Sequence, residues 1–258
     1  MGGRVSWISA TPVKALAVEQ LTEVELLERG LRGDRHFYLV DEANRLVNNK
    51  GRRGPLQLIH ATFDEEAPWL TVRLADGSAV EGEPAEVGEE LTTSFHRRPR
   101  AARRVPGPWD DALSDAAGEP VRLVVSRHGG ADRGRGGAAT LLGEASLGAI
   151  AGVLGVDAVD SRRFRMNFGV AGLEAHEEDA WIGRRVRIGE AVVVPQGNVG
   201  RCAITTQNPE TGRADLDTLK ALAAYRGERE TTEPLPFGIH AAVAEPGHVR
   251  VGDPVLPL

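Results

Sequence analysis

The chain has 258 residues, 41% of them hydrophobic and 26% charged, which is typical of a globular protein and excludes a disordered one. Its formal net charge of −6 argues against a protein that binds nucleic acid or anionic lipid over its whole surface. A single cysteine excludes an internal disulfide and suits a reducing cytoplasm. There is no signal-peptide pattern and no run of about 20 apolar residues, so we expect a cytoplasmic protein without a membrane segment.

Short strands separated by turn residues dominate the first half of the sequence. The Asp76-Gly77 pair predicts a hairpin turn between two of them. Many short strands at close spacing favour a barrel or a sandwich. We expect strands over residues 5–8, 37–40, 56–63 and 70–74.

Two cations of this half stand in turns that could present them to an anion. Pro12 holds the chain extended just before Lys14, and the glycines of residues 30–33 precede Arg35. The residues alone leave the ordinary alternatives open. Lys14 would then be a solvated lysine, and Arg35 would form a surface ion pair with Asp34.

One strongly basic run, residues 95–104, lacks the interleaved aromatic residues of a nucleic-acid-binding patch. A solvated face or a docking surface for an acidic electron-transfer partner fits it better. Proline and glycine then introduce a polar stretch that ends at Gly118. We interpret residues 106–118 as a linker and place a domain boundary near residue 118.

The second half begins with a glycine-rich stretch, residues 128–137, which matches neither a phosphate-binding loop nor a dinucleotide fingerprint. A helix is expected to start near Thr140 or Gly143. Farther on, Arg165 and Asn167 alternate with apolar residues, so on a strand these two polar side chains would share one face. Such a face suits a phosphate, because arginine donates to oxygen atoms and asparagine both donates and accepts, and the alternative is an amphipathic strand with a solvent-facing outer face.

Two other segments carry polar patterns. The acidic cluster of residues 174–179 does not match the His-Glu-x-x-His zinc motif, and we interpret it as structural or as a pocket edge, with a hard-metal site left open. Residues 215–226 predict a capped amphipathic helix, with Leu222, Ala223 and Arg226 among those on its core side.

The only cysteine, Cys202, follows Gly200 and Arg201 after an apolar strand and precedes a run of turn residues. We therefore expect it at a strand end or loop mouth. A neighbouring guanidinium favours the thiolate, which attacks electrophiles and binds soft metals. The alternatives are a buried cysteine that acts as a small hydrophobe and a nucleophile with a histidine base, although no histidine has a recognisable spacing. The absence of a Gly-x-Ser-x-Gly elbow counts against an ordinary serine hydrolase.

Residues 200–206, followed by Asn208-Pro209-Glu210-Thr211-Gly212, resemble the cysteine segment of MOSC domains. Residues 12–14 together with 30–35 resemble the N-terminal β-barrel domain that accompanies them. Residues 161–170 resemble the family's Arg-Phe-Arg-Pro-Asn segment, with Met166 where proline is usual. The stretch Gly129–Gly137 departs from the family, because residues 135–138 replace an acidic residue and a proline.

The resemblance implies an α+β, predominantly β fold. An N-terminal MOSC-associated β-barrel domain would span residues 1–118, and a MOSC β-barrel domain with a few peripheral helices would span residues 119–258. It covers nearly the whole chain and is strongest over residues 161–255.

The resemblance also implies a function. Cys202 would be the only protein ligand to the molybdenum of a molybdenum cofactor in its molybdopterin form. The protein would reduce small N-hydroxylated substrates with electrons from an external ferredoxin- or flavin-type donor, without nucleic acid or membrane. The residues expected to bind the cofactor are Lys14, Arg35, Arg165, Asn167, Gly200, Arg201 and Cys202.

Two other functions use the same cysteine. Cys202 could carry a persulfide and pass sulfur to a metal cluster or cofactor. Alternatively, the protein could bind and deliver the molybdenum cofactor without turnover. Lys14 and Arg35 favour a cofactor-binding protein over a bare sulfur carrier, because a sulfur carrier needs no pterin anchor.

Overall fold

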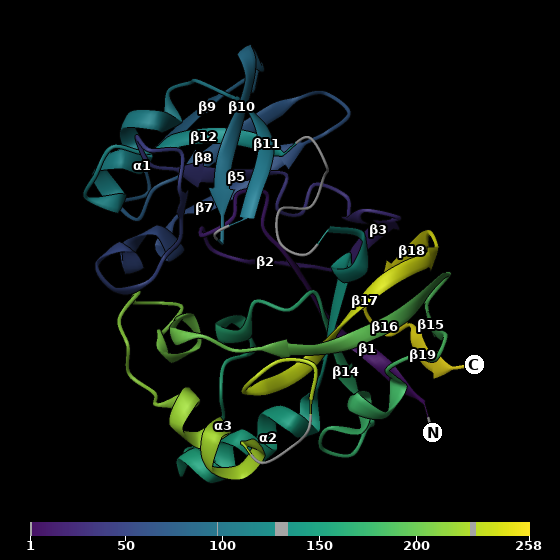
Figure 1. Cartoon of the computed structure of the whole chain (residues 1–258). Coiled ribbons are helices and arrows are strands. Elements are labelled where there is room, and N and C mark those ends of the chain that lie inside the picture. The colour runs from purple at the N-terminus through teal and green to yellow at the C-terminus, as the bar shows by residue number, and fades with distance from the viewer. Residues whose placement is uncertain (1, 97, 127–133, 228–230) are drawn as a thin grey trace.

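The computed structural model describes residues 2–96, 98–126, 134–227 and 231–258. In Figure 1 most of the first half of the chain lies above most of the second half. Short strands make up most of the regular structure, and the α-helices lie outside the sheets. The expected α+β, predominantly β fold is confirmed.

The lower part is a closed barrel of seven strands in the order β14-β13-β17-β16-β15-β19-β1, which closes because β1 also pairs with β14. β2 (Glu19–Leu21) extends β1 outside the ring. Apolar side chains from these strands, including Val5, Leu141 and Ile239, fill one core. The barrel strands are β1 (Gly3–Ala10), β13 (Ala139–Gly143), β14 (Phe168–Ala171), β15 (Val186–Ile188), β16 (Ala191–Gly200), β17 (Pro236–Glu245) and β19 (Pro254–Pro257).

The upper part contains a five-stranded sheet, β10-β11-β12-β5-β6, and a three-stranded sheet, β7-β8-β9. Buried side chains such as Leu39, Leu70 and Trp109 form its shared core. The predicted hairpin turn is confirmed, since Gly77 joins β8 to β9 with a φ of 87°. The strands are β5 (Phe37–Val40), β6 (Leu46–Val47), β7 (His60–Asp64), β8 (Trp69–Arg73), β9 (Ala79–Gly82), β10 (Val87–Phe95), β11 (Arg98–Arg104) and β12 (Arg122–Ser126).

Strand pairing crosses the predicted division at residue 118 in both directions. β1 belongs to the lower barrel, whereas β12 belongs to the upper sheet. A small third sheet joins β18 (Gly247–Arg250) to β3 (Glu23–Leu27) and β4 (Gly30–Leu31). Strands from both halves of the sequence therefore pair with each other. The division into residues 1–118 and 119–258 stays a prediction.

The segment expected to be a linker is instead partly helical. Residues Trp109–Ala117 form α1, which ends at Gly118 in a left-handed C-cap with a φ of 69°. The Trp109 side chain is 0% exposed and donates its indole N–H to the Val105 carbonyl at 2.9 Å. The polar residues of this segment are typical of a linker, which explains the prediction. The buried Trp109 side chain instead anchors the segment as a helix.

The observed bounds of other elements also differ from the predicted ones. The strand expected over residues 56–63 begins only at His60, because residues Gly51–Leu58 form a 3₁₀ helix, η1, that contains Pro55. The helix expected near Gly143 is confirmed as α2 (Glu144–Leu154), with Gly143 as its N-cap. The helix expected from residue 215 is α3 (Thr218–Arg226), and Ala223 is exposed rather than on its core side.

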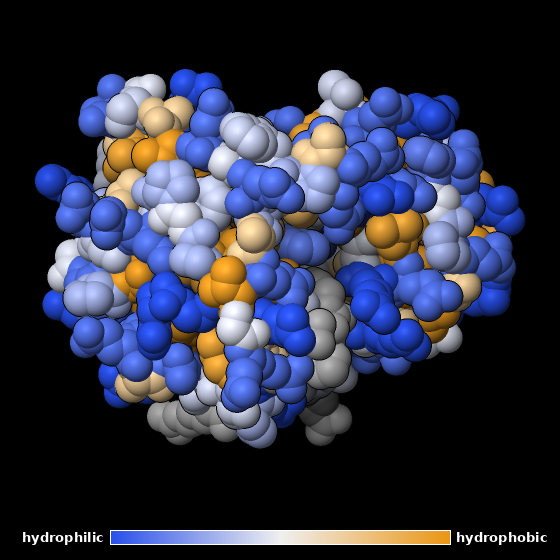
Figure 2. All heavy atoms as spheres, turned by 90° about the horizontal axis from the view of Figure 1, so that it is seen from above, coloured by the Kyte–Doolittle hydropathy of each residue, from blue (hydrophilic) through white to orange (hydrophobic). Residues whose placement is uncertain are grey.

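The surface seen in Figure 2 is mostly hydrophilic, with apolar side chains in small scattered groups. No helix within the described ranges is long and apolar enough to cross a bilayer.

A close backbone contact joins η1 to the turn that follows the cysteine segment. A Cβ built on Gly54 would lie 2.0 Å from the Gly212 carbonyl oxygen, and Gly212 itself has a φ of +68°. Beside them, the Gln57 amide donates to the Asn208 carbonyl at 2.6 Å. The upper part therefore holds the turn of residues 208–212 in place.

We expect Gly54→Ala to lower the free energy of unfolding by about 1–3 kcal/mol, because its methyl group has no space against Gly212. Gly148→Ala in α2 is the control. No atom lies within 4 Å of its added Cβ, and the change should stabilise the helix by about 0.5–1 kcal/mol. Urea unfolding of both variants measures the difference, and equal stabilities would contradict this close contact.

Candidate functional site

Cys202 lies just beyond the end of β16 and forms the N-cap of a short 3₁₀ helix, η5 (Ala203–Thr206). Its side chain is exposed, as expected for a cysteine at a strand end, so the alternative of a buried small hydrophobe is wrong. Its carbonyl accepts hydrogen bonds from the backbone N–H and hydroxyl of Thr205, both at 3.1 Å. The backbone is thus fixed while the thiol faces outward.

The residue before the cysteine, Arg201, is held in place by hydrogen bonds from its guanidinium. Nη1 donates to the Phe164 carbonyl at 2.9 Å, and Nε donates to the Phe237 carbonyl at 2.9 Å. The preceding Gly200 N–H donates to the Glu233 carboxylate at 2.9 Å. Arg201 therefore joins the cysteine segment to the segment that contains Arg165 and Asn167.

Arg165 and Asn167 do not lie on a strand, so the argument that strand alternation places them on one face is wrong. Residues Ser161–Phe164 form a 3₁₀ helix, η3, and Arg165 follows it in the left-handed region with a φ of 53°. β14 begins only at Phe168. The turn at Arg165 thus lies before the strand, and both polar residues precede it.

Asn167 is 3% exposed and its amide is fully engaged. Nδ2 donates to the Asp34 carboxylate at 3.0 Å and to the Ser9 carbonyl at 3.3 Å. Its Oδ1 accepts from the Thr140 hydroxyl at 2.9 Å. Because both amide hydrogens are used, this geometry favours a positioning role for Asn167.

Asp34 and Arg35 form a buried ion pair, with side chains 8% and 10% exposed. The ion pair expected at the surface is therefore buried, and the neighbouring Arg32 pairs with Glu25. Asp34 also accepts the Thr11 backbone N–H at 2.8 Å. Arg35 donates from Nη2 to the Arg165 carbonyl at 2.7 Å, so this pair connects the upper part to the Arg165 turn.

Lys14 is half-buried, and its backbone N–H donates to the Phe37 carbonyl at 2.9 Å. Its ammonium nitrogen lies 5.7 Å from the centre of the Phe95 ring. The loop that contains Lys14 also contains Thr11, whose backbone N–H donates to the Asp34 carboxylate.

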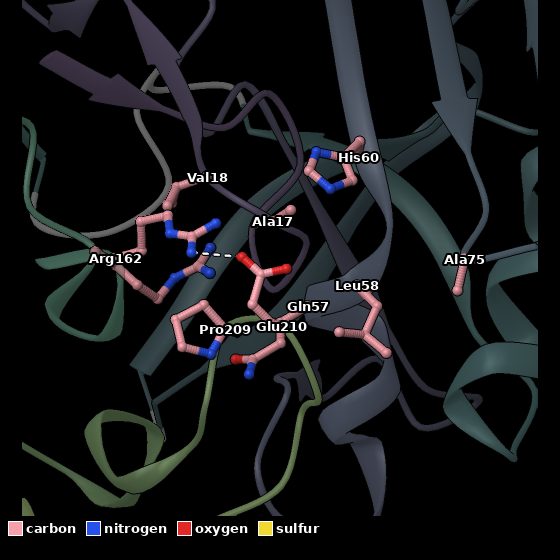
Figure 3. A pocket seen from close by; sticks show the side chains of 10 residues that line it. Ala17, Val18, Gln57, Leu58, His60, Ala75, Arg162, Pro209 and Glu210 are labelled. Atoms are coloured by element: carbon pink, nitrogen blue, oxygen red, sulfur yellow. Dashed lines mark hydrogen bonds and ion pairs between the residues drawn. The ribbon is translucent and has the colours of Figure 1, made fainter. Parts of the chain in front are cut away.

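A cavity of about 230 Å³ opens between the two parts of the molecule (Figure 3). Arg162 lies in it with its guanidinium between the Asp160 carboxylate at 2.7 Å and the Glu210 carboxylate at 2.5 Å. The hydrogen bond that its guanidinium donates to the Asp160 carboxylate is the main cause that raises the pKa of Arg162. Arg165 also lines this cavity, whereas Cys202 is not among its lining residues. The cavity is lined by Ala17, Val18, Gln57, Leu58, His60, Ala75, Arg162, Arg165, Pro209 and Glu210.

The acidic cluster of residues 174–179 is structural. Glu178 is 0% exposed, and burial raises the pKa of its carboxyl. It accepts the Gly143 N–H at 3.2 Å and the Ser146 hydroxyl at 2.9 Å, which ties this segment to the start of α2. The described part of the chain contains no group of three or more side chains arranged to hold a metal ion, so the hard-metal alternative receives no support.

The sequence did not single out Asp34, Thr140 or Arg162 as site residues. Asp34 stood beside Arg35 in a charged turn and was interpreted only as its surface partner. Thr140 precedes a helix and gave no signal. Arg162 lies in the basic segment that also contains Arg165, and only the fold shows that both line one cavity. Of the glycine-rich stretch, residues 128–133 lie outside the described ranges, and Gly134–Gly137 form a 3₁₀ turn, η2.

Comparison with known families agrees with this architecture. The MOSC domain matches residues 126–256, and the MOSC N-terminal beta barrel domain matches residues 2–104. The chain therefore belongs to the MOSC domain proteins, and it carries the N-terminal barrel domain of that family as well.

Among characterised relatives, the chain is similar to mitochondrial amidoxime-reducing component 1 of Xenopus laevis, with 35% identity over 98% of this chain and 81% of that protein. It is 43% identical to mitochondrial amidoxime reducing component 2 of Homo sapiens, over 36% of this chain and 29% of the human protein. The match with the human protein thus spans less than a third of that relative's length. Among solved structures, the YuaD protein of Bacillus subtilis is similar with a TM-score of 0.46 and 12% identity, over 99% of this chain and 94% of that one.

We expect Asp34→Ala to lower the free energy of unfolding by about 3–5 kcal/mol, because it removes the carboxylate that Arg35 faces inside the protein. The control is Arg45→Ala, which breaks an ion pair with Asp41 in which Arg45 is 70% exposed. That change should cost less than about 1 kcal/mol. Urea unfolding measures both, and a cost for Asp34→Ala no larger than that of the control would contradict the role of this carboxylate.

Proposed function

We propose that this MOSC protein is a molybdenum-cofactor-dependent reductase of small N-hydroxylated compounds, with Cys202 as the protein ligand to the metal. One observation carries the proposal. The only cysteine is exposed at the end of a barrel strand, and its neighbour Arg201 is hydrogen-bonded to the Phe164 carbonyl beside the Arg165 turn. A soft thiolate and nearby cations are the groups that a thiol-bound metal on an anionic cofactor requires.

The residues fit such a cofactor in donor type and in charge. Cys202 offers the sulfur, and Lys14 and Arg165 offer positive charge on either side of the junction between the two parts. Arg35 and Asn167 are buried and bonded to Asp34, so we assign them to positioning the Arg165 turn. The cavity lined by Arg165 is smaller than the roughly 300–1,000 Å³ of most ligand pockets, and therefore suits one end of a large ligand.

When bound, the cofactor supplies two-electron oxygen-atom chemistry at the metal. The overall reaction balances as an N-hydroxylated compound plus two electrons and two protons, giving the compound without its hydroxyl oxygen and one water. The chain itself would hold the thiolate beside Arg201, orient the anionic ligand by charge, and leave the Cys202 side open to a small substrate. Electrons would come from a separate ferredoxin- or flavin-type donor, in a cytoplasmic setting.

The names of the relatives support this assignment. Mitochondrial amidoxime-reducing component 1 of Xenopus laevis aligns with 98% of this chain. An amidoxime is an N-hydroxylated compound, and the named activity of the relatives is its reduction. We therefore propose the same class of substrate for this chain.

We expect the protein produced in a cofactor-competent host to contain about one molybdenum per chain, and Cys202→Ser to lose most of it, because thiolate is a far better soft-metal ligand than a hydroxyl. Ala203→Ser, at the next and also exposed position, is the control and should keep the metal. Elemental analysis measures both. Amidoxime reduction with a viologen donor should follow the metal content.

Other outcomes would replace the proposal. A Cys202 persulfide found by mass spectrometry in a protein without molybdenum would indicate the sulfur carrier. Molybdenum without amidoxime or hydroxylamine turnover would indicate a binding or delivery protein. Equal molybdenum in wild type and Cys202→Ser would overturn the assignment of the ligand.

A further inference from the structure

We propose that Glu210 is a side-chain gate of the cavity between the two parts of the molecule. Its carboxylate is bonded to the Arg162 guanidinium, and a phosphate-type anion that enters the cavity takes its place there. This anion site does not depend on the proposed function, since it requires neither molybdenum nor the thiol of Cys202.

Asp160 orients the Arg162 side chain at the start of η3. Its carboxylate caps this 3₁₀ helix by accepting the Arg162 backbone N–H at 2.8 Å. The same carboxylate accepts from Nε of Arg162 at 3.0 Å and from Nη2 at 2.7 Å. These bonds join residues two apart within one turn, so they hold the guanidinium in the cavity whether or not another anion binds to it.

Glu210 makes a weaker contact with the same guanidinium. It comes from the turn of residues 208–212 and accepts only from Nη2 of Arg162, at 2.5 Å. Figure 3 shows its side chain directed toward Arg162. The Glu210 side chain is 70% exposed, whereas that of Asp160 is 32% exposed. Because an exposed ion pair contributes little to stability, Glu210 is the more easily displaced of the two carboxylates.

The backbone beneath Glu210 is fixed, so the gate opens by a change of side-chain rotamer alone. The Glu210 N–H donates to the Asn208 side-chain oxygen at 2.8 Å, and the Gly212 N–H donates to the Asn208 carbonyl at 2.9 Å. The Gln57 amide donates to the same carbonyl at 2.6 Å. Exposed side chains change rotamer within picoseconds to nanoseconds, so the gate should not limit the rate at which an anion enters.

The cavity behind the gate suits an oxyanion. Arg162 uses Nε and Nη2 for its two carboxylates, and its Nη1 makes no hydrogen bond to any residue that the structure describes. Arg165 also lines this cavity, although it has a further partner of its own. A guanidinium matches the oxygens of a phosphate group in geometry. The cavity volume of about 230 Å³ is several times the roughly 30 Å³ share of one water, which leaves room for such a group.

The charges around Arg162 favour the exchange of one anion for another. Arg162 has one positive charge and faces two carboxylates, so Asp160 alone would neutralise it. A singly charged anion that replaces Glu210 keeps this balance, whereas an anion that binds beside Glu210 adds a third negative charge. Because like charges at close range repel, the bound anion and the Glu210 carboxylate exclude each other.

The test is a calorimetric titration with inorganic phosphate, at fixed pH and ionic strength, of protein without molybdenum. Glu210→Gln keeps the size of the side chain and removes its charge. It should lower the dissociation constant of phosphate about fivefold, equivalent to about 1 kcal/mol. Glu245→Gln is the matched control, because it removes an exposed carboxylate that pairs with Arg185 outside the cavity lining. This control should change the dissociation constant less than about 1.5-fold.

Arg162→Gln gives a second reading. It should raise the dissociation constant of phosphate about tenfold or more. Adding Glu210→Gln to it should have no further effect, because the carboxylate then has no guanidinium to occupy. If Arg162→Gln does not fold, the two glutamate variants still decide, since both side chains are exposed. No phosphate binding by wild type and Glu210→Gln, equal dissociation constants for these two, or the same gain in Glu245→Gln would overturn the gate.

The phosphate group is either free or the end of a larger ligand. Phosphate binding that is lost in protein loaded with molybdenum cofactor would identify the cofactor's phosphate end as the occupant. Binding that loading leaves unchanged would identify a free phosphate. Molybdenum content separates the gate from the proposed function. Molybdenum bound through Cys202 without any phosphate binding would overturn the gate alone, and gated phosphate binding in a protein that takes up no molybdenum would overturn the proposed function alone.

Discussion

The buried carboxylate of Asp34 is the constraint on which the site depends. It accepts hydrogen bonds from Thr11, Arg35 and Asn167, which come from the loop after β1, from its own turn and from the segment before β14. A buried charge is expensive unless it is paired and hydrogen-bonded, so these three segments must keep their relative positions for Asp34 to remain satisfied. The carboxylate therefore fixes where the two parts of the molecule meet.

The cysteine segment is attached to this centre by a second set of contacts. Arg201 connects Cys202 to the Phe164 carbonyl, one residue before Arg165, and Arg35 binds the carbonyl of Arg165 itself. From the other side, Gly54 packs on Gly212 in the turn after the cysteine. Both parts thus hold the chain around Cys202 while its thiol stays exposed, so the proposed ligand would be preorganised by the fold.

The sequence predicted what local pattern determines. The strand at residues 37–40, the Asp76-Gly77 turn and the exposed cysteine at a strand end all follow from nearby residues. It missed features set by distant contacts. Trp109 turns a polar stretch into an anchored helix by burial, and the left-handed φ at Arg165 breaks the alternation expected of a strand. The burial of Asp34 depends on Asn167, 133 residues away, which no local pattern can show.

The central claim is that Cys202 is the protein's sulfur ligand to molybdenum, held where both parts of the chain meet. X-ray absorption at the molybdenum edge tests it most directly, because it counts the sulfur atoms bound to the metal. With two sulfurs from the cofactor, the account predicts about three sulfur neighbours in wild type and about two in whatever metal Cys202→Ser retains. About two sulfur neighbours in wild type, or the same count in both proteins, would contradict it.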